Sequence, residues 1–95
     1  MRSILIVALT VLPITAMAEN PICAPTGEIV GRAVEARVAG QGAPDAIKVI
    51  SADMTGDLAT YEPAVQPLVD WVYSLEEAEL AQDVPGSYVT QCEAQ

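Results

Sequence analysis

The sequence predicts an all-α fold, a small bundle of three to four short helices closed by one disulfide. Three observations support this prediction. Apolar residues recur at helical spacing in several separate segments, and no segment of any length shows the alternation of a β-strand. Glycine and proline residues separate these segments from one another. The chain also contains two cysteines, Cys23 and Cys92, which lie far apart in the sequence.

The first part of the chain, residues 1–18, has the pattern of a secretory signal peptide. Arg2 supplies a positive charge, an apolar run extends from Ile4 to Leu12, and Ala16-Met17-Ala18 matches the small-residue motif before a cleavage site. The apolar run is shorter than the roughly 20 residues that a membrane span requires. We therefore expect cleavage after Ala18, a periplasmic or secreted product, and no stable membrane anchor after cleavage.

The expected product, residues 19–95, is a single small domain near the lower size limit for a self-sufficient core. An even number of cysteines in a short exported chain predicts a disulfide, so we expect Cys23 and Cys92 to be bonded to each other. A C-x-x-C redox motif is absent, and two thiols without a histidine cannot complete a zinc site. The bridge would close almost the whole domain and supply much of its net stability.

Two helices are expected in the first half of this domain. Thr26 can cap the first helix, with Glu28 in its first turn, and the helix carries an apolar stripe up to the sequence AGQGAP. Pro44 and Asp45 suit the first turn of the second helix, and Gly56 is expected to close it.

Two further helices are expected in the second half. In EPAVQPLVDWVYSL, Pro63 and Pro67 confine the third helix to a regular part that begins near Gln66. The last helix opens at Pro85-Gly86-Ser87 and places Tyr88 one turn before the terminal cysteine. The third helix is the clearest core element, because its apolar residues form an i, i+3, i+4, i+7 stripe of Val65, Leu68, Val69, Val72 and Leu75.

The charge of the chain narrows the classes of partner. The sequence has 13 acidic residues, four basic residues and a net charge of −9. Nucleic acid and anionic membrane surfaces are disfavoured as partners, since both attract Lys and Arg. A cationic protein is the partner class that the charge favours. The alternative is that the acidic surface only keeps an exported protein soluble.

Candidate partner-binding residues lie on and after the third helix. Trp71 and Tyr73 flank its apolar stripe and can serve as aromatic anchors for a partner, or they can form the edge of the core with Trp71 partly exposed. The acidic residues Glu76, Glu77 and Glu79 follow, either as contacts for a cationic partner or as a solvated helix end and loop.

The arginines of the expected product have a different predicted role. Arg32 and Arg37 are expected to form ion pairs with Glu28, with Glu35 or with the acidic residues near the C-terminus.

The residues predict no metal, no cofactor and no catalysis. The polar cluster that begins at Asp53 looks like a calcium loop, but counting from Asp53 puts Gly56 at position 4 and Ala64 at position 12. A calcium loop needs glycine at position 6 and Glu at position 12. The chain has no histidine to act as a general base. Both thiols are committed to the expected bridge, and no serine lies in a nucleophile-elbow motif.

Four short motifs carry a resemblance to a known group of proteins. They are a cysteine near the mature N-terminus, EARVAG at residues 35–40, VDWVY at residues 69–73, and Tyr88 four residues before the terminal cysteine. In these motifs the chain resembles a loose group of small, mostly uncharacterised exported two-cysteine proteins of Gram-negative bacteria. The resemblance implies a helical, disulfide-closed fold and implies no known activity. The acid-stress chaperones of the HdeA type are similar in general plan only, being small, helical, periplasmic and closed by one disulfide.

Two functions follow as alternatives. The first is a non-enzymatic periplasmic or secreted protein that binds or neutralises one cationic protein partner. The second is an acid-stress chaperone, because protonation of the carboxylates near pH 4 would reverse the sign of the net charge.

Overall fold

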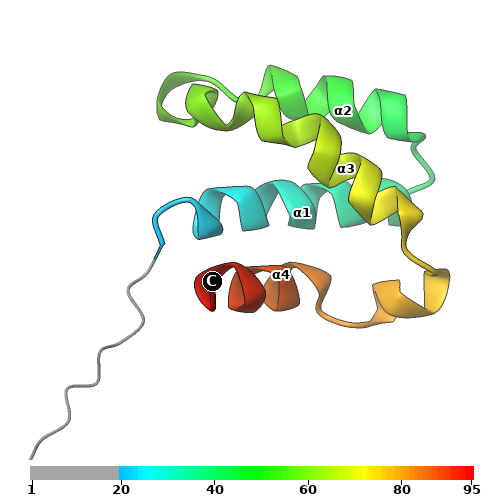
Figure 1. The fold of residues 1–95 in the computed structure, drawn as a ribbon. Coiled ribbons are helices and arrows are strands. Elements are labelled where there is room, and N and C mark those ends of the chain that lie inside the picture. The colour runs from blue at the N-terminus through cyan, green and yellow to red at the C-terminus, as the bar shows by residue number, and fades with distance from the viewer. Residues whose placement is uncertain (1–19) are drawn as a thin grey trace, which may run out of the picture.

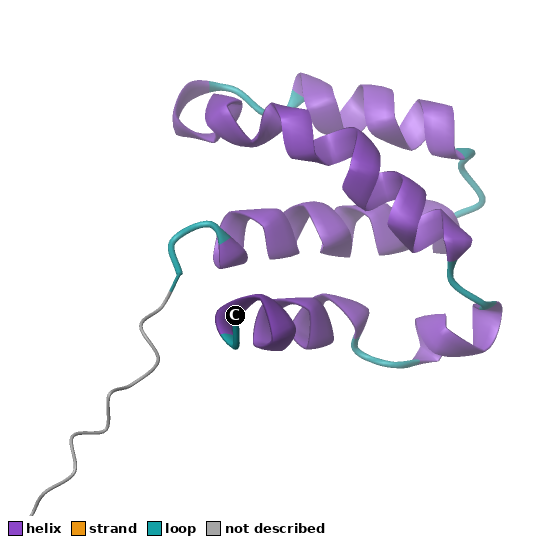
Figure 2. Ribbon diagram, in the orientation of Figure 1, coloured by secondary structure: helices purple, strands orange, loops and turns teal. Residues whose placement is uncertain are grey.

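A computed structural model describes residues 20–95 (Figure 1). The predicted signal peptide and its cleavage site lie outside the described residues. Every element of the described part is helical (Figure 2), which confirms the predicted all-α fold. Two of the elements, η1 and η2, are 3-10 helices. The elements in chain order are α1 (Cys23–Val38), α2 (Ala43–Ala52), η1 (Gly56–Ala64), α3 (Val65–Ser74), η2 (Glu77–Ala81) and α4 (Val84–Glu93).

The longest helix, α1, forms the centre of the bundle. It lies between α4 on one side and α2 with α3 on the other, and it packs against all three (Figure 1). Its side chains of Ile29, Val30 and Ala33 are fully buried. The other members of the buried core cluster are Ala46, Ile50, Met54, Val65, Val69, Val72 and Val84.

The start of α1 differs from the prediction. The helix begins at Cys23, so Thr26 is a buried residue within the helix and Glu28 lies beyond the first turn. The Thr26 hydroxyl does not cap the helix; it donates to the carbonyl oxygen of Ile22 at 2.6 Å. Pro25 is compatible with this earlier start, because the N–H groups of a first helical turn have no acceptor within the helix.

The segment between α2 and α3 also differs in detail. The second helix ends at Ala52, before Gly56, and Gly56 has a φ of +61° at the beginning of η1. Pro63 lies inside η1, and α3 begins at Val65, one residue before the predicted start. Pro67 lies in the first turn of α3, where its missing N–H costs no helical hydrogen bond.

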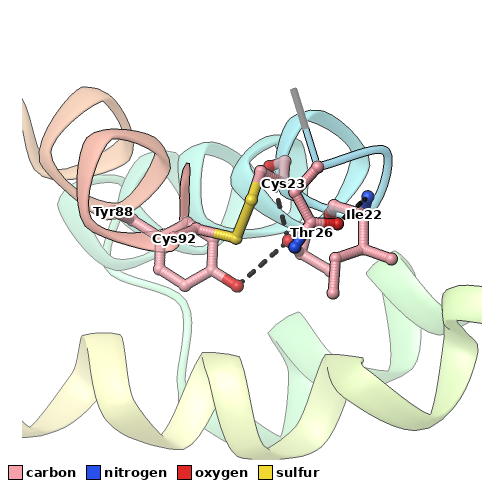
Figure 3. Close-up of a disulfide and its surroundings, with 6 residues drawn as sticks. Ile22, Cys23, Thr26, Tyr88 and Cys92 are labelled. Atoms are coloured by element: carbon pink, nitrogen blue, oxygen red, sulfur yellow. Dashed lines mark hydrogen bonds between the residues drawn. A yellow bond between two sulfur atoms is a disulfide. The ribbon is translucent and has the colours of Figure 1, made fainter. Parts of the chain in front are cut away.

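The predicted disulfide is confirmed, and it joins α4 to the start of α1 (Figure 3). Cys23 and Cys92 have Cα atoms 5.8 Å apart and are separated by 69 positions in the sequence. Next to the bridge, the Tyr88 hydroxyl donates to Thr26 Oγ1 at 3.0 Å. A covalent bond and a hydrogen bond therefore fix the same two helices to each other.

The two helices also approach closely at a glycine. A Cβ atom at Gly27 of α1 would overlap Cγ2 of Val89 on α4. One turn further along α1, a Cβ atom at Gly31 would lie 3.6 Å from Cγ of Pro85, which is an ordinary van der Waals contact. Only the first of these two positions requires glycine for packing.

Removal of the bridge should cost much of the stability. We expect a variant with Cys23→Ala and Cys92→Ala to lose about 4 kcal/mol in free energy of unfolding, because the unfolded chain regains the entropy of a loop of about 70 residues. Urea unfolding followed by circular dichroism measures this loss. Reduction of the natural protein with dithiothreitol is the matched control and should give the same loss. A loss below about 1 kcal/mol would mean that the bridge contributes little to stability.

The two glycines of α1 should respond in opposite directions to alanine. We expect Gly27→Ala to destabilise the oxidised protein by about 1–3 kcal/mol, because the β-branched Val89 side chain cannot easily move away. Gly31→Ala should be neutral or stabilise the protein by up to about 1 kcal/mol through helix propensity. Thermal unfolding compares the two variants, and equal melting temperatures would contradict the close approach at Gly27.

Candidate functional site

A groove with a volume of about 220 Å³ lies between α3 and α4. The α3 side of the groove is formed by Trp71 and Leu75. Its remaining lining comes from η2, the η2–α4 junction and α4 itself, and consists of Glu79, Gln82, Asp83, Val84, Ser87, Tyr88 and Gln91.

The groove follows from the central position of α1. Both α3 and α4 pack against α1, whereas they do not make a comparable contact with each other. The main aromatic contact across the space is between Trp71 and Tyr88, with ring centroids 6.2 Å apart and planes inclined by 47°. Trp71 remains 40% exposed, so its ring is accessible to a ligand.

Two carboxylates of the groove are held by backbone hydrogen bonds. Glu79 Oε1 accepts from the N–H of Glu76 at 2.8 Å, as part of a capping box at the start of η2. Asp83 Oδ1 accepts from the N–H of Gly86 at 3.0 Å and caps the N-terminus of α4. One oxygen of each carboxylate is fixed in this way, and the second oxygen takes no part in these bonds. The groove therefore presents carboxylates in defined positions beside aromatic rings.

The five predicted partner-binding residues separate into two groups. Trp71 and Glu79 both line the groove. Glu76 supports Glu79 through the capping box, and Glu77 is an exposed residue of η2 that does not line the groove. Tyr73 lies elsewhere, where its hydroxyl donates to the carbonyl oxygen of Gln41 at 2.8 Å.

Seven of the nine groove residues were not among the predicted binding residues, and Tyr88 and Asp83 are the aromatic and the acidic residue among them. Tyr88 lies one turn before Cys92 in the sequence, and Asp83 follows the acidic residues Glu76, Glu77 and Glu79. The sequence signal for both is weak: an Asp before Val84 and Pro85 is typical of a helix N-cap, and Val84 and Tyr88 share one face of the following helix. No local sequence pattern indicates that this face of α4 approaches Trp71.

Both arginines of the described part make contacts between elements. Arg32 Nη1 lies 2.7 Å from Asp53 Oδ2, at the end of α2. Arg37 Nη1 donates to the carbonyl oxygens of Val72 at 2.8 Å and Leu75 at 2.7 Å, at the C-terminus of α3. A cation at this end of a helix satisfies carbonyls that lack helical partners and opposes the negative end of the helix dipole.

The predicted ion pairs of these arginines were therefore wrong. Neither Arg32 nor Arg37 pairs with Glu28, Glu35 or the acidic residues near the C-terminus. The prediction relied on helical neighbours three or four positions away. The long arginine side chains instead reach acceptors on α2 and α3, which only the tertiary fold brings close.

Tyr73 belongs to the structural contacts of Arg37. The guanidinium carbon of Arg37 lies 6.0 Å from the centroid of the Tyr73 ring. Burial raises the pKa of the Tyr73 hydroxyl above its ordinary value of 10.0, Arg37 opposes this shift, and Asp45 adds to it. The hydroxyl is therefore protonated at neutral pH and donates its hydrogen bond to Gln41.

Within residues 20–95, no group of three or more Cys, Asp or Glu side chains is arranged to hold a metal ion. No helix in the same part of the chain has the length and apolar character needed to cross a membrane. Comparison of the chain with protein-family models, curated proteins and solved structures gives no match.

The two arginines should contribute unequally to stability. We expect Arg37→Met to lower the free energy of unfolding by about 1.5–3 kcal/mol, because two charge-assisted hydrogen bonds to helix-end carbonyls are lost. Arg32→Met is the matched control, and it should cost at most about 1 kcal/mol because its ion pair is exposed to solvent. Methionine retains much of the apolar stem in both variants. Urea unfolding compares them, and equal losses would contradict the structural role of Arg37.

Proposed function

We propose that the protein is an exported, non-enzymatic binding protein that binds or neutralises one cationic protein partner. The observation that carries this proposal is uncompensated negative charge. Twelve of the 13 acidic residues lie in the described part, and among them only Asp53 lies within 4.0 Å of a basic group. Arg37 directs its guanidinium at carbonyl oxygens of α3, so it neutralises no carboxylate. A surface of this kind attracts cationic proteins over a distance of about one Debye length.

The groove between α3 and α4 is the part of this surface best suited to a specific contact. Trp and Tyr are over-represented among the residues that dominate protein–protein affinity, and here Trp71 and Tyr88 lie together in the groove. Glu79 and Asp83 add negative charge beside them. An aromatic contact next to carboxylates is complementary to a basic segment of a partner.

A non-catalytic role is supported by the chemistry of the side chains. The chain has no histidine, and both cysteines form the bridge.

A second candidate function, that of an acid-stress chaperone, is favoured by one observation. The start of η2 and the start of α4 are capped by the carboxylates of Glu76, Glu79 and Asp83. Protonation weakens a carboxylate as an acceptor of these bonds. In acid the α4 segment would loosen and expose apolar surface of α1, while the Cys23–Cys92 bridge would keep it attached.

One capture experiment separates the two functions. The purified oxidised protein is immobilised and exposed to envelope extract at about pH 7 and again near pH 3. We expect one basic protein to be retained at neutral pH in a stoichiometric amount, with an affinity that falls as salt is added. The control bait carries amides in place of the carboxylates of Glu76, Glu77, Glu79 and Asp83, and it should retain less of this protein.

Each other outcome has a definite meaning. Retention of many unrelated proteins only in acid would support the chaperone and contradict the dedicated binder. If no basic protein is retained at neutral pH, the proposed function is wrong.

A further inference from the structure

We propose that the groove between α3 and α4 binds one arginine side chain of the cationic partner, an inference that rests on the proposed function. The guanidinium group lies beside the carboxylates of Glu79 and Asp83. The apolar stem of the arginine lies along Leu75 and Val84, and the neighbouring part of the partner contacts the exposed ring of Trp71.

The shape of the groove suits a single side chain. At one end η2 supplies Glu79 and its junction with α4 supplies Asp83, and toward the other end Trp71 lies opposite Tyr88. Leu75, the residue after α3, and Val84, the first residue of α4, lie between these two ends, because each is four residues from the aromatic residue on its own side of the groove. A volume of about 220 Å³ accommodates one long side chain but not a helix or a strand.

The charge at the junction end favours a guanidinium. Glu79 and Asp83 each have one oxygen fixed by a backbone N–H, so each offers its second oxygen in a defined place. Preorganised acceptors lose less freedom when a ligand binds. A guanidinium has five N–H donors in a plane and can serve two separate carboxylates at once, whereas an ammonium group acts as a compact point charge.

Within the same molecule, Arg37 shows how an aromatic ring and fixed oxygen acceptors together hold a guanidinium group. Arg37 of α1 places its guanidinium near the ring of Tyr73 and donates to two fixed carbonyl oxygens at the C-terminus of α3. The proposed site repeats this combination of an aromatic ring and fixed acceptors, with carboxylates in place of carbonyl groups. Trp71 also has the aromatic ring that attracts cations most strongly.

A second copy of this chain is not a suitable donor of the arginine. Both arginines of the described part are engaged within the molecule, Arg32 with Asp53 and Arg37 with α3. Charge repulsion between two chains of net charge −9 also opposes such a dimer. The charge complementarity therefore points to a different, basic protein.

The sequence provides a direct reporter for this site. Trp71 is the only tryptophan of the chain, so its fluorescence reports on the groove. The probe is a blocked Gly-Arg-Gly tripeptide, titrated into the oxidised full protein at low ionic strength. We expect saturable quenching or a spectral shift. The same tripeptide with citrulline, which is neutral and nearly isosteric, should bind at least tenfold more weakly, and the lysine tripeptide should bind several-fold more weakly.

A pair of charge-matched variants tests the role of the carboxylates. Glu79→Gln with Asp83→Asn removes two charges from the groove and keeps the helix caps, because Gln and Asn serve at these cap positions. Asp57→Asn with Glu62→Gln removes two charges from exposed residues of η1 outside the groove. We expect the first variant to lose at least tenfold in affinity for the arginine tripeptide, and the second to lose less than twofold.

The outcomes distinguish this inference from the proposed function. The site is overturned if Trp71 shows no saturable response, if citrulline binds as well as arginine, or if both charge variants lose affinity equally. In each of these cases the proposed function still stands if a basic protein is captured at neutral pH, and the partner then binds another face. If arginine binds as expected but no basic protein is captured, the groove site stands as a binding site and the proposed function fails.

Discussion

The bond between Cys23 and Cys92 is the constraint on which the position of α4 depends. The last helix, α4, contributes only Val84 to the buried core. The burial of apolar side chains alone would therefore hold α4 only weakly against α1. Without α4 in place, Trp71 would have no opposing wall and the groove would not exist. A covalent bond between α1 and α4 thus holds in place a groove wall that includes Tyr88 and Gln91. This dependence is typical of small domains, whose cores are too limited to hold every element.

Folding and surface charge are linked through the same few cations. Arg32 joins α1 to the end of α2, and Arg37 joins α1 to the C-terminus of α3. The fold therefore uses the positive charges as internal contacts, and most carboxylates stay at the surface without a counterpart. Lys48 is an exposed residue on α2 and offsets only one negative charge. The same arrangement that stabilises the bundle also leaves the surface with a large excess of negative charge.

The sequence was sufficient for the features that depend on local pattern. Helical periodicity, the Gly and Pro breaks and the even cysteine count predicted the helices and the bridge. Of the five candidate binding residues that residue type indicated, Trp71 and Glu79 line the groove. The features that could not be predicted depend on tertiary position. The start of α1 depends on whether Pro25 lies within the first turn, and the contacts of Arg37 depend on where α3 ends. The groove itself depends on the separation of α3 and α4 by α1, which no local pattern records.

The close approach at Gly27 has a consequence for how this sequence can diverge. A side chain at position 27 would collide with Val89, and the bridge next to it prevents α4 from moving away. Positions 27 and 89 are therefore coupled, so that a larger residue at the first becomes acceptable only together with a smaller residue at the second. Position 31 carries no such restriction, because a Cβ atom there has room beside Pro85. Among related chains, the joint pattern at 27 and 89 would mark those that keep this helix crossing.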